Sequence, residues 1–288
     1  MKIKFPPKRI VVPVDMSKPS LAALEAAKTL ARSTGARLDI VYIQDLPLSL
    51  LGFSPEVEGP GRELAHQMEE FKAWRQERIN RATRGLPPKS VRVRTIQGWP
   101  PRALADLAAG PGADLVLMGT HGYAGLNRAF FGSVAEAVVR RARVPVLTVH
   151  GDGKPLSLGK ILVPFNGQAY AEKAVLCARA WANRFRARLT VLYVEPKDLH
   201  ERQRTAAIES RVRKLLGPDA RGASFKVRHG NAPHEILTEA ERSHDLIVLA
   251  AHRRSFWSDF VLGSTAERVL RHSTVPVLSV PSVEKGGR

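Results

Sequence analysis

The stretch KRIVVPVDMSKPSLAALEAAKTLARSTGARLDIVYIQD, residues 8–45, decides the fold because it contains two apolar strands with a helix between them. The strands, IVVPV (10–14) and LDIVYI (38–43), are largely apolar on successive residues, which is typical of a parallel sheet covered by helices on both faces. Between them, small and aliphatic residues recur at helical spacing. The stretch therefore predicts a strand–helix–strand unit of an α/β domain.

The same order of elements occurs a second time in the chain. Residues 159–196 match 8–45, residues 228–251 match 96–119, and VPVLSV (275–280) matches VPVLTV (144–149). Each half then consists of five strands alternating with four helices. The sequence predicts an α/β protein made of two tandem doubly wound open parallel sheets, Rossmann-like, with five strands each.

The repeat also predicts the domain boundaries. We expect a first domain over residues 1–150, a linker with Gly and Pro over 151–158, a second domain over 159–282 and a frayed tail over 283–288. The first half carries extra residues, mostly 46–61 and a longer helix expected over 62–85.

Composition indicates a soluble globular protein. The chain has 288 residues, of which 44% are hydrophobic and 25% charged, and no apolar run is long enough for a spanning helix. The N-terminal residues do not resemble a secretory signal, so we expect a cytoplasmic protein. The single cysteine, Cys177, has no partner for an internal disulfide, and we expect it to be a small core residue.

The net charge of +18 raises the question of nucleic-acid binding. The charge is spread evenly, with 22 Lys and Arg against 13 Asp and Glu in residues 1–150 and 23 against 14 in the rest. No basic run and no nucleic-acid-binding motif occurs. We therefore expect a solvated basic surface, without a membrane partner or a specific nucleic-acid partner; a polyanion-binding module is the less favoured alternative.

The stretch MGTHGYAGLNRAFFGSVAE (118–136) places three glycines, Gly119, Gly122 and Gly132, after a predicted strand and before a helix. Ligands of open parallel sheets bind beyond the carboxyl ends of the strands. We expect Gly119 and Gly122 to adopt positive φ and to let the backbone approach a ligand, although plain turns are an alternative for any glycine pattern.

The helix that begins after Gly132 offers free N–H groups and the Ser133 hydroxyl to a phosphate. Asp15 follows the first strand and is expected at the same edge of the sheet. Its carboxylate could accept a hydrogen bond from a ribose hydroxyl or help to hold a divalent cation. Together these features favour a nucleotide site.

The order VPVD, YIQD, MGTHG, nine residues, GSVAE and VPVLTV resembles the universal stress protein family in its tandem two-domain form, over residues 5–282. In that family the frame Gly-x2-Gly-x9-Gly-Ser/Thr marks the ATP-binding branch. The resemblance implies an adenine nucleotide α-hydrolase-like fold, ATP as the ligand, accompanied by Mg through Asp15, and a role in the stress response.

The resemblance also assigns the first-half site residues. The family's adenosine-contacting turn corresponds to Pro13, Val14 and Asp15, and its strand position near the adenine corresponds to Ile43. The loop over the ribose and phosphates corresponds to Met118, Gly119 and Gly122. The start of the triphosphate-binding helix corresponds to Gly132, Ser133, Val134 and Ala135. Tyr123 stands where the family often has an arginine, so Arg128 is expected to supply the phosphate-facing charge.

The second half keeps only part of this pattern. Asn166, Ala250 and Arg253 replace Asp15, Gly119 and Gly122, while Gly263 and Ser264 remain. We expect this half to bind ATP weakly or not at all and its loop to take another path, since Ala is strained at positive φ. The alternative is that Arg253 and Arg254 bind phosphates by charge.

The last strand of each half would leave an open apolar edge, so we expect the two edges to pair in an internal pseudo-dimer, and whole chains to form a homodimer in addition.

No P-loop, G-x-S-x-G elbow or metal-ligand pair of Cys or His occurs. We therefore predict a non-enzymatic ATP-binding regulatory protein, with no catalytic residue and at most slow hydrolysis; the alternative is an ATP-using enzyme of the same α/β class.

Overall fold

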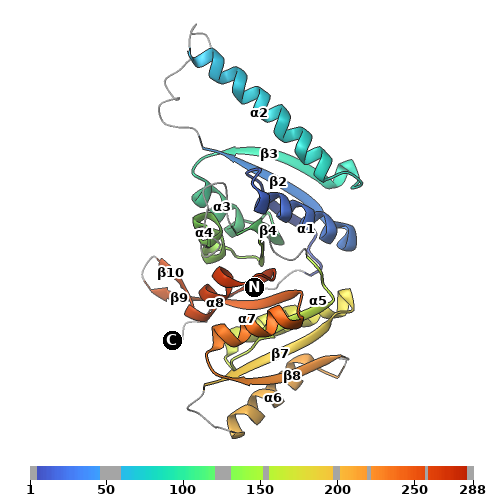
Figure 1. Ribbon diagram of the computed structural model, residues 1–288, viewed down its shortest axis with the longest axis vertical. Helices are drawn as coiled ribbons and strands as arrows, with labels where there is room; N and C mark the ends of the chain where they lie inside the picture. Colours follow the sequence, from blue (N-terminus) through green and yellow to red (C-terminus); the bar gives the residue numbers. More distant parts are fainter. Residues whose placement is uncertain are drawn as a thin grey trace.

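The computed structural model describes residues 5–45, 60–120, 131–151, 156–196, 202–218, 222–256 and 259–283 (Figure 1). The first half contains β1 (Arg9–Pro13), α1 (Lys18–Thr34), β2 (Arg37–Gln44), α2 (Pro60–Ala82), the 3-10 helix η2 (Pro88–Ser90), β3 (Val91–Gln97), α3 (Pro100–Ala109), β4 (Leu115–Gly119), α4 (Ser133–Arg141) and β5 (Val146–Val149).

Among the described residues, the second half repeats this order of strands and α-helices, with two additions. It contains β6 (Lys160–Pro164), the 3-10 helix η3 (Ala169–Ala171), α5 (Glu172–Phe185), β7 (Arg188–Glu195), α6 (Arg202–Leu216), β8 (Ala223–His229), α7 (Ala232–Ser243), β9 (Leu246–Phe256), β10 (Asp259–Leu262), α8 (Ser264–His272) and β11 (Val277–Val283). The additions are η3 before α5 and β10 after β9.

The strands of the described residues form one continuous sheet in the order β3-β2-β1-β4-β5-β11-β9-β6-β7-β8, with β10 paired to β9. Within each half the neighbours on this path are parallel, as the apolar strands predict. The halves meet where β5 and β11 pair antiparallel, with Leu278 opposite Leu147. The expected pairing of the last strands is present, and it turns two sheets into one.

Two hydrophobic clusters cover the opposite faces of this sheet. Successive residues of β1 alternate between them, with Ile10 and Val12 in one cluster and Val11 in the other. The first cluster contains residues of α1, α2, α5 and α6 and runs through both halves, and the second contains residues of α3, α4, α7 and α8. The doubly wound architecture predicted from the sequence is therefore confirmed.

Aromatic packing joins the halves on the face covered by α1 and α5. Phe5, before β1, lies 5.5 Å from Trp181 and 6.3 Å from Phe185 between ring centroids, and both partners belong to α5. The Arg184 guanidinium donates to the carbonyl oxygen of Ser33 at the end of α1. Among the described helices, none is both long and apolar enough to cross a membrane.

One detail of the fold differs from the prediction. The second half has a sixth strand, because β9 continues to Phe256 and the chain returns as β10, with Leu262 opposite Arg253. The sequence predicts a loop at this point, by analogy with the glycine stretch of the first half. Without glycines at 250 and 253, the main chain here forms an antiparallel hairpin.

Candidate functional site

The turn between β1 and α1 fixes Asp15 at the carboxyl edge of the sheet. The Val14 amide donates to the carbonyl oxygen of Val41 at 2.9 Å, which holds the turn against β2. The Asp15 carboxylate oxygen Oδ1 accepts from the Ser17 amide at 3.0 Å and from the Ser17 hydroxyl at 2.6 Å. Its other oxygen, Oδ2, has no such partner among the described residues and remains available to a ligand.

The chain reverses at this turn through a left-handed residue in both halves. Met16 has φ of 67°, and its counterpart Gly167 has φ of 81°. A left-handed conformation is costly for a residue with a side chain, so Met16 is held there by its surroundings, and its side chain is 4% exposed in the core.

Gly119, the last residue of β4, is required for a reason other than the predicted one. It does not have positive φ, which corrects that expectation. Instead, a Cβ at this position would lie 2.7 Å from the carbonyl carbon and the Cβ of Pro19, and 2.8 Å from the Pro19 oxygen. Gly119 thus allows the first turn of α1 to lie directly against the end of β4.

The start of α4 forms the second side of the site. Gly132 is its N-cap without a side-chain cap hydrogen bond, and its amide donates to the carbonyl oxygen of Thr120 at 2.8 Å. Thr120 is itself held by β5, because its amide donates to Val149. Ser133, Val134 and Ala135 form the first turn of α4, where N–H groups have no acceptor within the helix, and such groups can bind anions.

The structure brings most of the predicted first-half residues to this one edge. Pro13 is the last residue of β1 and Asp15 follows that strand. Met118 is the last residue but one of the neighbouring β4, and β1 pairs with β4 through Val11 and Val116. Ile43, on β2, packs against the same cluster as Met118, on the α4 face. Gly122 and Arg128 lie outside the described residues, so their predicted roles stay predictions.

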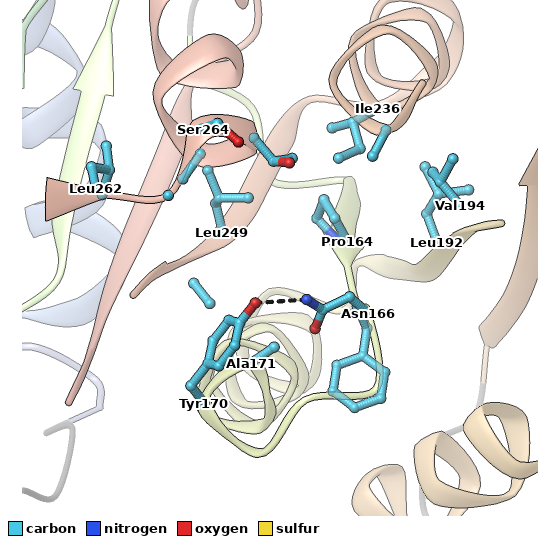
Figure 2. A pocket seen from close by; sticks show the side chains of 16 residues that line it. Pro164, Asn166, Tyr170, Ala171, Leu192, Val194, Ile236, Leu249, Leu262 and Ser264 are labelled. Atoms are coloured by element: carbon cyan, nitrogen blue, oxygen red, sulfur yellow. Dashed lines mark hydrogen bonds between the residues drawn. The ribbon is translucent and has the colours of Figure 1, made fainter. Parts of the chain in front are cut away.

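The equivalent edge of the second half contains a cavity of about 460 Å³ (Figure 2). Its wall comes from β6, the segment before α5, β7, α7, β9, the end of β10 and the start of α8. Among its sixteen described lining residues are the counterparts of ten of the twelve predicted first-half residues, namely Pro164, Phe165, Asn166, Val194, Leu249, Ala250, Gly263, Ser264, Thr265 and Ala266. The second half therefore has an open cavity where the first half has its predicted site.

The chemistry of this cavity differs from that of the first half. The Asn166 amide nitrogen donates to the Tyr170 hydroxyl at 2.6 Å, and its oxygen accepts from the Gln168 amide at 3.1 Å. Tyr170 is the counterpart of Pro19, and it lies in η3, so α5 begins three residues later than α1 does. Ala250 of the second half stands where the first half requires Gly119.

Arg253 lies on β9 between Val283 of β11 and Leu262 of β10, and its side chain lies outside the described part. The different path expected for this segment is present, but its cause is strand pairing and not strain at positive φ. The sequence signal that could have revealed the hairpin is the run HRRSF followed by DFVL, two short segments separated by only two residues.

Among the residues that the structure describes, two side chains have clearly shifted pKa values, and both lie outside the candidate site. Burial raises the pKa of the Cys177 thiol to about 12, which makes it an inert core residue, as predicted. Burial also acts to raise the pKa of Glu239 on α7, but hydrogen bonds and charge from Lys226 and Arg228 outweigh it and hold that pKa below its ordinary value. This pairing attaches α7, which supplies part of the cavity wall, to β8.

Comparison with known proteins agrees with the duplicated fold. The chain matches the model of the universal stress protein family twice, over residues 6–150 and 158–281. A universal stress protein of Methanocaldococcus jannaschii is 33% identical over 147 residues, which cover 49% of this chain and 81% of that protein. One of Mycolicibacterium smegmatis is 28% identical over 193 residues, 62% of this chain and 65% of that protein.

Similarity at the level of structure extends over almost the whole chain. The crystal structure of a universal stress protein from Archaeoglobus fulgidus aligns with a TM-score of 0.71, covering 95% of this chain and 98% of that one at 19% identity, which shows a shared fold. With both halves matched by the same family model, the chain belongs to the universal stress protein family, in a tandem form with two domains.

Proposed function

We propose that the first half binds ATP at the carboxyl edge of its sheet and that the protein acts in the cytoplasm as a non-enzymatic regulator in the stress response. The observation that supports this most is the meeting of Asp15 and the uncapped start of α4 at one edge, because they offer an acceptor for ribose and donors for phosphates.

Magnesium fits this site as a companion of the nucleotide. The described residues contain no cluster of three side chains that could hold a metal by themselves. Mg²⁺ bound with nucleotides typically uses one or two carboxylates together with the phosphates, and the second oxygen of Asp15 can provide such a ligand. Bound there, the ion would neutralise phosphate charge that Asp15 would otherwise repel.

Asp15→Asn tests the proposal directly, because it copies Asn166 into the first half. We expect ATP affinity in the presence of Mg to fall at least about tenfold, the loss typical of a hydrogen bond to a charged group, when it is measured by calorimetry on the full chain. Glu77→Gln on α2 removes the same charge from an exposed position and should leave the affinity unchanged. Equal affinities for the three proteins would overturn the assignment of Asp15.

The role in regulation implies little turnover. Steady ATP hydrolysis faster than about 1 per second, the low end of ordinary enzymes, would contradict a non-enzymatic protein.

We also propose that the β5–β11 junction serves as an internal pseudo-dimer interface and that whole chains associate further as homodimers. Light scattering that gives the mass of one chain at all concentrations would refute the homodimer.

A further inference from the structure

Two large apolar side chains lie exposed and side by side on α2. Phe71 and Trp74 are 41% and 40% exposed, and their ring centroids lie 5.3 Å apart. Large apolar side chains scattered singly over a surface are ordinary, whereas adjacent ones form the kind of patch at which proteins associate. The pair is a feature of the first half, because α6, the counterpart of α2 in the second half, contains no aromatic residue.

The helix α2 is fixed to the sheet along one side. Between positions 66 and 81, the described residues that are buried are Arg75 and Ile79, one helical turn apart. The Arg75 guanidinium carbon lies 4.0 Å from the centroid of the Tyr42 ring on β2, and Arg75 donates to the Thr95 hydroxyl on β3 at 3.1 Å. Figure 1 shows α2 at one end of the molecule, beyond β3, the edge strand of the sheet. The remaining sides of this helix are therefore accessible to another molecule.

The exposed aromatic pair belongs to a stripe whose charge changes sign at Trp74. An α-helix has 3.6 residues per turn, so six described and exposed residues of α2 project within an arc of about 100°. This set, the α2 stripe, consists of Gln67, Glu70, Phe71, Trp74, Arg78 and Arg81. Glu70 precedes Trp74 and is negative, whereas Arg78 and Arg81 follow it and are positive. A stripe with opposite charges at its two ends is complementary to an antiparallel copy of itself.

Trp74 is the natural centre of such a pairing. The described part of α2, residues 66–82, extends equally far on both sides of Trp74. With a two-fold axis at this position, Glu70, four residues before it, lies opposite Arg78 of the second copy, four residues after it. A two-fold interface uses every contact twice, so the same axis places the two Trp74 side chains together and forms two pairs between Glu70 and Arg78.

The local geometry of these side chains suits the pairing. The Glu70 side chain is 69% exposed, beside His66 of the same helix at 3.6 Å. The Arg78 guanidinium carbon lies 5.0 Å from the centroid of the Trp74 ring. A guanidinium that stacks on a ring donates in its own plane, so it can meet a carboxylate while it stays on the ring. Tryptophan and arginine are also the residues that most often dominate the binding energy of an interface.

We propose that the α2 stripe is the contact between two copies of this chain, joined antiparallel about Trp74, with Glu70 of each copy paired to Arg78 of the other. This inference rests on the homodimer of the proposed function and assigns a surface to it; it does not depend on ATP. A contact made by one helix of each copy belongs to the small interfaces. We therefore expect a reversible dimer whose population rises with protein concentration.

Sedimentation velocity of the full chain over a range of concentrations tests this proposal. Trp74→Ala should weaken association at least about 30-fold, the effect of a central interface residue. Glu70→Arg and Arg78→Glu should each weaken it about tenfold, since two attractions become two repulsions, and the double variant should restore it. Trp99→Ala, at a tryptophan that is 64% exposed before α3, and Glu209→Arg on α6 are the matched controls and should leave association unchanged. Thermal unfolding of every variant checks that the fold is kept.

The results distinguish failure of this surface from failure of the proposed function. A dimer that none of the α2 variants weakens leaves the homodimer standing and overturns the inference. Single charge reversals that weaken association without restoration in the double variant overturn the antiparallel pairing. Monomers at every concentration overturn the inference and the homodimer together, whereas ATP affinity measured on the same samples tests the nucleotide site by itself.

Discussion

Replacing Gly119 with Ala should destabilise the first half without any ligand present. The added Cβ would lie 2.7–2.8 Å from the carbonyl carbon, the carbonyl oxygen and the Cβ of Pro19, closer than real Cβ contacts. Two of these atoms are backbone, so the start of α1 must move as a unit. Overpacking of this kind costs about 1–3 kcal/mol, and we expect the apparent Tm to fall by about 2–4 °C for each kcal/mol.

Ala250→Gly is the matched control, since it makes the reciprocal change in the second half. There Tyr170 in η3 takes the position of Pro19, and we expect only the loss of about 0.5–1 kcal/mol typical of glycine in a strand. Thermal unfolding of both variants should be compared with ATP affinity. If Gly119→Ala weakens ATP binding but leaves Tm unchanged, the glycine serves ligand approach alone and the packing argument is refuted.

Two further predictions concern the shifted pKa values. Glu239→Gln should destabilise the protein by about 1–3 kcal/mol at pH 7, because Lys226 and Arg228 lose their charged partner. Since the pKa of Glu239 is lowered in the folded protein, this stabilisation is present above the unfolded pKa and disappears as the pH falls through the folded pKa. The difference in thermal stability between Glu239→Gln and the unaltered protein should therefore be smaller near pH 3 than at pH 7. A large difference that persists at low pH would contradict it. Cys177 should resist a thiol reagent in the native protein and react fully in denaturant; fast native labelling would show that the thiol is accessible.

The fold was largely predictable because it depends on patterns that act locally. Apolar runs such as IVVPV and LDIVYI can be satisfied only between two layers of helices, and the internal repeat then fixes the architecture of both halves. The pairing of β5 with β11 followed from the same argument, since two apolar edges of one chain are at high local concentration. Each of these predictions rests on hydrophobic burial.

The site was harder to predict because its details depend on contacts between distant segments. Gly119 is constrained by Pro19, a hundred residues earlier, and nothing in the sequence around Gly119 reveals that approach. The reading of Ala250 as strained failed for the same reason, because the delayed start of α5 is a property of another segment. The cavity of the second half was not predicted either, because its wall combines residues of several segments; weak or absent ATP binding there stays a prediction.

The hairpin of the second half also connects the two candidate sites. Both β9 and β10 contact α4, the helix whose first turn we propose to bind the phosphates in the first half (Figure 1). Leu262, which ends β10 and lines the second cavity, belongs to the same hydrophobic cluster as Phe131 and Ala135 at the start of α4. Because packed cores deform little, a ligand that shifts the hairpin must either move α4 or be resisted by it. The β9–β10 hairpin therefore does two things: it takes the place of the glycine frame in the second half, and it contacts α4, the helix that follows the glycine frame in the first half.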